Sequence, residues 1–156
     1  MRWALVLTAI VAAMLLSAVA PTGHGRSGDP TASSDAVRFE TVDVTIDAGD
    51  EGLAAYQFEL MTNEGVTIVG VEGGERGAYV EAPFYDAAAL AGGRIIVGAL
   101  ASGDVPPRGA TRVARLHMRV EGGVEPRYEC VLRIAATAQA TKIRDAAIGV
   151  REGMTR

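Results

Sequence analysis

Aromatic residues and cysteine are scarce in this chain of 156 residues. Aromatic side chains make up 5% of it, and Cys130 is its only cysteine. So few rings argue against a sugar-binding surface of many stacked aromatics, and a single thiol excludes an internal disulfide framework. Cys130 belongs to an alternating apolar run with Tyr128, Leu132 and Ile134, which predicts a buried and unreactive thiol.

The chain also lacks any run of lysine or arginine. Its 15 basic and 19 acidic residues give a net charge of −4. Proteins that bind nucleic acid need a concentrated basic surface, so the sequence excludes a nucleic-acid partner. Apolar residues, in contrast, make up 49% of the chain. That is enough to build the hydrophobic core of one domain.

The first residues predict export. Arg2 precedes an uncharged apolar segment, Trp3 to Ala20, so residues 1–25 are expected to be a signal peptide or an N-terminal membrane anchor. The choice stays open, because Ala18-Val19-Ala20 suits signal peptidase whereas the following Pro21 does not. Either way we expect a secreted, periplasmic or cell-envelope protein, with residues 26–36 as a flexible spacer.

The remainder of the chain shows the alternation of apolar and polar residues that is typical of β-strands. Strands are expected at residues 42–47, 54–61, 66–72, 94–100, 114–120, 128–136 and 147–150. The strand at 94–100 is apolar on both faces, which predicts a central strand. One short helix is expected at residues 87–91, capped by Asp86. The pattern predicts an all-β sandwich over residues 37–150, followed by a polar tail at 151–156.

The order of several segments resembles a known family. A Val-x-Val-x-Ile-Asp strand is followed by Leu-Ala-Ala-Tyr-Gln-Phe-Glu-Leu at residues 53–60, and further matching stretches stand at residues 68–74, 94–100 and 109–120. This order resembles the cohesin-like domains of the carbohydrate-binding-domain-like superfamily. The resemblance implies a jelly-roll β-sandwich of about nine strands with one short helical insertion. It also implies a protein partner, of dockerin-like or unknown type, bound on one face of a sheet.

The residue sets that catalysis needs are not found together in the sequence. His117 lies between Arg115 and Arg119 on a predicted strand, with no serine or cysteine nucleophile beside it. No cysteines and histidines have zinc-binding spacing, and no two carboxylates are distinguished as a glycosidase pair. The glycine-rich stretch at residues 70–74 lacks the following helix of a phosphate-binding loop. We therefore predict that the protein is not an enzyme.

The candidate binding residues form two groups. Four polar residues on one strand are expected to contact an acidic protein partner: Arg112, Arg115, His117 and Arg119. In an alternative interpretation, three aromatic residues near the short helix stack on a polysaccharide: Tyr79, Phe84 and Tyr85. A further alternative is a structural domain of the cell envelope that has no discrete ligand.

One loop carries the only candidate metal ligands. Asp47, Asp50 and Glu51 lie close together in a glycine-containing turn. Carboxylate oxygens on a loop suit Ca²⁺, so a calcium site is one expectation and a solvated acidic turn is the other. No other cofactor is predicted.

Overall fold

A computed structural model of the chain describes residues 36–75, 77–101 and 105–153. The expected signal or anchor at residues 1–25 and residues 26–35 of the expected spacer lie outside this range. Within it, no helix has the length and hydropathy that crossing a membrane requires.

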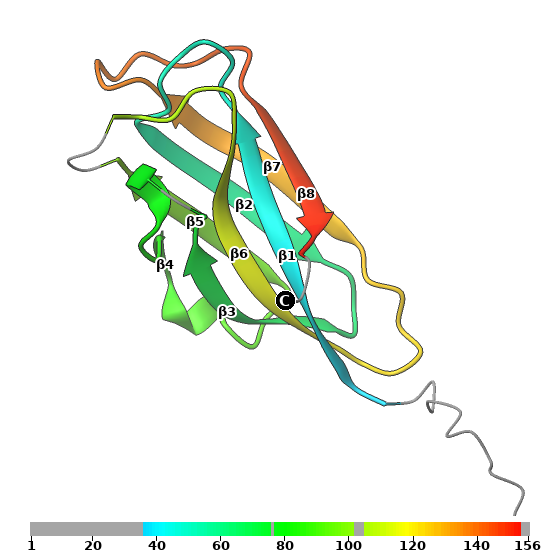
Figure 1. Cartoon of the computed structure of the whole chain (residues 1–156). Helices are drawn as coiled ribbons and strands as arrows, with labels where there is room; N and C mark the ends of the chain where they lie inside the picture. Colours follow the sequence, from blue (N-terminus) through cyan, green and yellow to red (C-terminus); the bar gives the residue numbers. More distant parts are fainter. Residues whose placement is uncertain (1–35, 76, 102–104, 154–156) are drawn as a thin grey trace, which may run out of the picture. The chain divides into compact units, whose positions relative to one another are not determined.

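The described residues form two antiparallel four-stranded sheets, with strand orders β3-β6-β1-β8 and β4-β5-β2-β7. The strands are β1 (Arg38–Asp47), β2 (Ala55–Thr62), β3 (Val66–Gly73), β4 (Phe84–Tyr85), β5 (Arg94–Leu100), β6 (Ala110–Val120), β7 (Tyr128–Ala136) and β8 (Ala147–Glu152). Figure 1 shows the two sheets as the layers of a sandwich. The predicted all-β sandwich is therefore confirmed.

The strand pairing is nested, as in a jelly roll. β1 pairs with β8, β2 with β7, β3 with β6 and β4 with β5, so the first half of the chain runs antiparallel to the second half in reverse order. The pairs β1–β6 and β2–β5 join these ribbons into sheets. Every connection except that between β4 and β5 passes from one sheet to the other.

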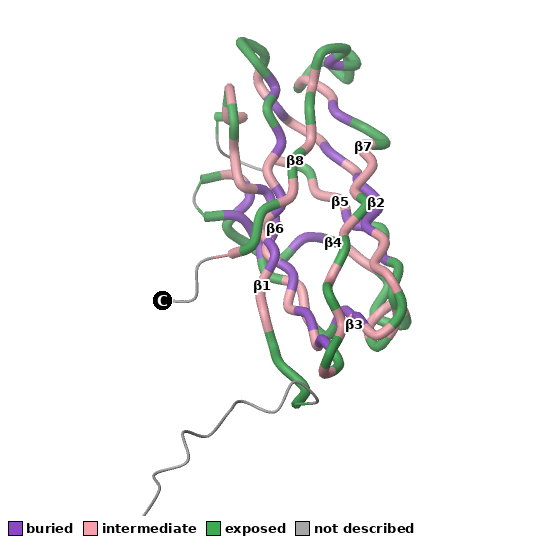
Figure 2. Tube along the Cα trace, turned by 90° about the vertical axis from the view of Figure 1, so that its right-hand side faces the viewer, coloured by how far each residue is buried: buried purple, intermediate pink, exposed green. Residues whose placement is uncertain are grey.

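The apolar residues that alternate with polar ones along the strands form the core, as the sequence predicts. On β1, Val42, Val44 and Ile46 are fully buried between the sheets, whereas Asp43 and Thr45 lie on the outer face. Figure 2 shows the same alternation of buried and more exposed positions along the strands. Because side chains alternate across a strand, the local pattern is enough to define the buried face.

A β-bulge interrupts the alternation on β6. The register with β1 shifts between Val44 and Thr45, and the consecutive residues Val113 and Ala114 are both fully buried. The extra residue turns Arg112 to the same outer face as Arg115, although strict alternation would put them on opposite faces. This bulge brings the predicted polar residues of β6 together.

Helical structure in the described residues is limited to two short 3₁₀ turns, η1 (Gly77–Tyr79) and η2 (Ala87–Ala89). Asp86 caps η2 as predicted, since the Ala88 backbone N–H donates to Asp86 Oδ1 at 2.9 Å. The turn is shorter than the predicted helix, because Ala91 adopts a left-handed φ of 68°. At the other end of the chain, β8 continues to Glu152 and pairs with β1 beyond the predicted boundary at residue 150.

Candidate functional site

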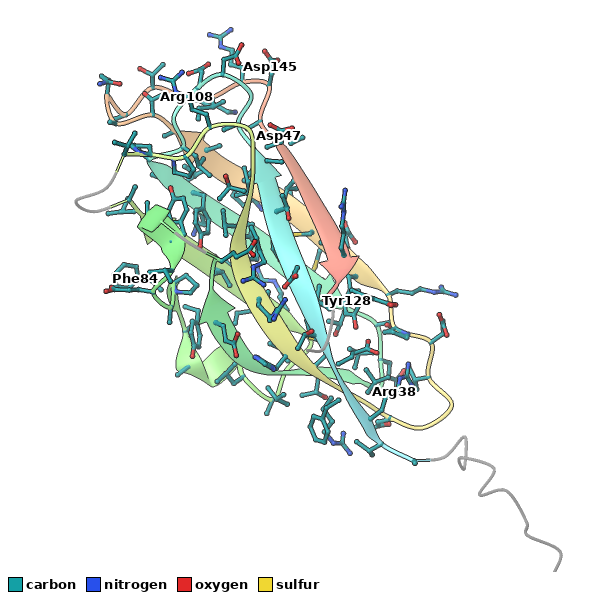
Figure 3. All side chains as sticks on the ribbon, viewed as in Figure 1. Arg38, Asp47, Phe84, Arg108, Tyr128 and Asp145 are labelled. Carbon is teal, nitrogen blue, oxygen red and sulfur yellow. The ribbon has the colours of Figure 1, made fainter. Side chains whose placement is uncertain are left out.

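The outer face of the β4-β5-β2-β7 sheet carries an apolar hollow of about 620 Å³. Large apolar side chains around it are exposed to solvent: Phe84 by 78%, Leu100 by 67%, Ile134 by 47% and Ile96 by 38%. Figure 3 shows the Phe84 ring pointing away from the ribbon at β4. These residues come from three strands, so the sheet register assembles the site.

Gly98 forms the floor of the hollow. The register places it directly opposite Phe84 on β4 and opposite Gln57 on β2, and Gln57 lies opposite Ile134 on β7. With no side chain at Gly98, the sheet is depressed between its neighbours. A Cβ atom added there would lie 3.0 Å from the Tyr56 carbonyl oxygen. The glycine therefore creates the hollow and also accommodates a close backbone approach.

A charged cluster lies beside the hollow. Glu59 on the central strand β2 is 5% exposed, and it accepts hydrogen bonds from Arg94 Nε at 2.6 Å and Arg133 Nε at 3.0 Å. The hydrogen bonds from Arg133 and then Arg94 hold the pKa of Glu59 below its ordinary value. The carboxylate is therefore ionised at neutral pH, and the cluster has two positive charges and one negative charge.

The four polar residues predicted to bind a protein partner lie together on the outer face of the other sheet. Each of them faces a carboxylate of this same chain. Arg115 Nε and Nη2 donate to the two oxygens of Asp43 at 2.7 and 2.9 Å, and Arg112 Nη1 approaches Asp43 at 3.4 Å. His117 Nε2 lies 2.8 Å from Glu72.

The remaining member of this group, Arg119, pairs with Glu121 at 3.4 Å. Arg115 holds the pKa of Asp43 below its ordinary value, chiefly through its hydrogen bonds. The predicted positive stripe is therefore largely neutralised within the chain, so it offers less net charge to an acidic partner than the sequence suggests. Asp43 and Glu72 come from β1 and β3, so their positions depend on strand register, whereas Glu121 directly follows β6.

The three aromatic residues predicted to bind a sugar do not form one surface. Tyr79 is 2% exposed, its hydroxyl donates to the Leu53 carbonyl at 2.6 Å, and its ring meets Tyr56 edge to face at 5.0 Å. Burial raises its pKa to about 12. The proposed stacking role of Tyr79 is thus corrected to a core role, because η1 turns the ring inward. Phe84 and Tyr85 do line the hollow.

The three acidic residues predicted to bind calcium lie in a turn that forms hydrogen bonds within the chain. Asp47 Oδ1 accepts a hydrogen bond from the Gly49 backbone N–H at 2.9 Å, and Arg108 donates to the Asp50 backbone oxygen. In the part of the chain that the structure covers, no three acidic, histidine or cysteine side chains are grouped to hold a metal ion. The calcium site at Asp47, Asp50 and Glu51 stays a prediction, and these hydrogen bonds fit its alternative, a solvated acidic turn.

The sequence interpretation missed most of the hollow. Residues 94–100 form a central strand as predicted, between β4 and β2, but Ile96 and Leu100 of this strand lie on an open outer face. The sequence signal for these two residues was that the alternate positions on the outer face of the strand carry apolar side chains, together with the glycine at position 98.

Comparisons of the chain with protein-family models, curated proteins and solved structures find no match. The cohesin-like resemblance stays a prediction from the sequence.

Proposed function

We propose that this chain is a non-catalytic binding module that holds a protein partner against the outer face of its β4-β5-β2-β7 sheet. The observation that carries the proposal is the set of four large, exposed apolar side chains around one hollow. Contiguous apolar surface is unfavourable in water, and in soluble proteins it marks a place where another molecule binds.

The groups that line the hollow support binding rather than catalysis. Its described lining contains no serine, cysteine, histidine or lysine. The carboxylate of Asp86 caps η2, and Glu59 beside the hollow is bonded by two arginines. None of these groups is free to act as a nucleophile or a general base.

The expected context agrees with this role. The cohesin-like resemblance over residues 37–150 implies a protein partner on a sheet face, and the predicted export segment at residues 1–25 puts that partner at the cell envelope. A polysaccharide is the second candidate ligand, favoured by the exposed Phe84 ring beside Tyr85. Two rings are fewer than an extended sugar platform uses, so the protein partner takes precedence.

Capture from native envelope extract tests the proposed function. The full chain and its Leu100→Ser and Phe39→Ser variants are immobilised in parallel. Phe39 is a matched control, because it is 73% exposed but lies on β1 in the other sheet. We expect one protein to be retained by the wild type and by Phe39→Ser but lost with Leu100→Ser. Equal retention by all three, or no retained protein, contradicts the proposal.

A further inference from the structure

We propose that a second copy of this chain pairs with the open edge of β7. The two β4-β5-β2-β7 sheets then form one continuous sheet across a two-fold axis at Val131. This contact goes beyond the proposed function, since it uses the edge of the sheet rather than the hollow on its face.

Among the described residues, β7 is an end strand of its sheet and pairs with β2 alone between Tyr128 and Ile134, with a β-bulge at Arg133. The edge of β3 is covered in part, since the Ala91 N–H donates to the Ile68 carbonyl at 2.8 Å. β4 has only two residues, and β8 has six with Gly149 among them. Short strands and covered edges resist pairing with another chain, so β7 is the edge best suited to it.

The open stretch of β7 has a defined end. The Ile143 N–H donates to the Ala135 carbonyl at 2.9 Å, and Ala136 bridges to Lys142, so the edge is closed from Ala135 onward. Val131 is the midpoint of the remaining stretch, Tyr128 to Ile134. A two-fold axis at this midpoint uses the whole open edge and forms an isologous contact.

The backbone N–H and C=O groups of β7 point in the directions that this register needs. The Asn63 N–H donates to the Arg127 carbonyl at 3.4 Å, and in an antiparallel ladder such pairs recur at every second residue. Arg127, Glu129 and Val131 therefore direct their backbone groups toward β2. Cys130 and Leu132 direct theirs to the open edge. With the axis at Val131, Cys130 of each copy lies opposite Leu132 of the other as a hydrogen-bonded pair.

The same register balances the charged cluster. Arg94 and Arg133 share the single carboxylate of Glu59, whereas Glu129 is exposed and forms no ion pair within the described residues. Pairing about Val131 places Glu129 of the second copy beside Arg133, the residue at the β-bulge. Opposite charges on facing strands stabilise a sheet, and each cluster then has two positive and two negative charges.

Charge reversal at Glu129 tests the interface. Mass is measured by light scattering of the full chain over a concentration series. We expect the mass to rise toward twice 16.2 kDa. Glu129→Arg should raise the dimer dissociation constant about tenfold, because the two-fold axis repeats the repulsion with Arg133, and Glu129→Gln should have a smaller effect. Unchanged circular dichroism and melting temperature show that the variants fold.

A disulfide between the two copies of an introduced cysteine tests the register of the proposed β7–β7 pairing. Val131→Cys is made in a Cys130→Ser background, so that the new thiol is the only one. The two copies of residue 131 form a non-hydrogen-bonded pair, in which the Cα atoms are about 4.5 Å apart, and this distance is within reach of a disulfide. Val105→Cys in the same background is the control, since Val105 is 87% exposed and lies between β5 and β6, outside the proposed strand pairing. We expect a linked dimer only with Val131→Cys. A monomer at all concentrations, a dimer indifferent to Glu129→Arg, or equal linking at position 105 overturns the proposal.

Discussion

Phe84 on β4 lies directly opposite Gly98 on β5, so the phenyl ring has no side chain beside it on the neighbouring strand. The ring is 78% exposed as a result, and the surface is open above the glycine. This cross-strand pair connects sequence to function, because one missing side chain creates the apolar hollow that we propose as a docking site.

Filling the hollow from its floor should weaken binding. Gly98→Val adds a side chain whose Cβ lies 3.0 Å from the Tyr56 carbonyl, so we expect a stability loss of about 1–3 kcal/mol from crowding and loss of the captured partner. Gly149→Val on β8 is the matched control, since no atom lies within 4 Å of its Cβ position. Urea unfolding and capture measure the two effects. Full capture by Gly98→Val would exclude the hollow as the site.

The packing of the sandwich predicts that alanine substitutions at two leucines change the free energy of unfolding by very different amounts. Leu116 on β6 is fully buried, whereas Leu100 on β5 is 67% exposed. We expect Leu116→Ala to lower the free energy of unfolding by about 2–5 kcal/mol and Leu100→Ala to change it by no more than about 0.5 kcal/mol. Chemical unfolding of both variants checks this, and similar losses at the two positions would contradict the described packing.

The Asp43–Arg115 pair should make stability depend on pH. The pKa of Asp43 is lowered from 3.8 in the folded chain, so its contribution is present above that value and is lost as the pH falls through the lowered pKa. We expect Asp43→Asn to cost less than about 1 kcal/mol at pH 7. The difference from the wild type should be constant down to about pH 4 and shrink below it. Unfolding midpoints from pH 2 to 7 measure this, and a gap that widens in acid would disagree.

The sequence predicts the strands well because burial in a sandwich is a local pattern. Val42, Val44 and Ile46 alternate in the sequence and are buried in the structure, as period-two geometry requires. The bulge at Val113 and Ala114 is different. Both are small apolar residues, and their sequence does not indicate that two consecutive side chains face the core. The outward turn of Arg112 is thus a property of the paired strands.

The candidate site is harder to predict, since it depends on what covers each face. Residues 94–100 are apolar on both faces, a pattern that a doubly covered strand and an exposed binding face share. The pairing of Arg115 with Asp43 joins residues 72 positions apart, so only the register reveals it. Tyr79 is near Phe84 in sequence, but a 3₁₀ turn directs its ring to the Leu53 carbonyl.

The most direct test of the account is site-specific photo-crosslinking in living cells of the source organism. A benzophenone side chain replaces Phe84 in the full chain, and a second strain carries it at the equally accessible Phe39 on the opposite sheet. We predict one discrete adduct to another protein from position 84 and none from position 39. An absence of adducts at position 84, or the same adduct from both positions, would contradict a docking site on the β4-β5-β2-β7 face.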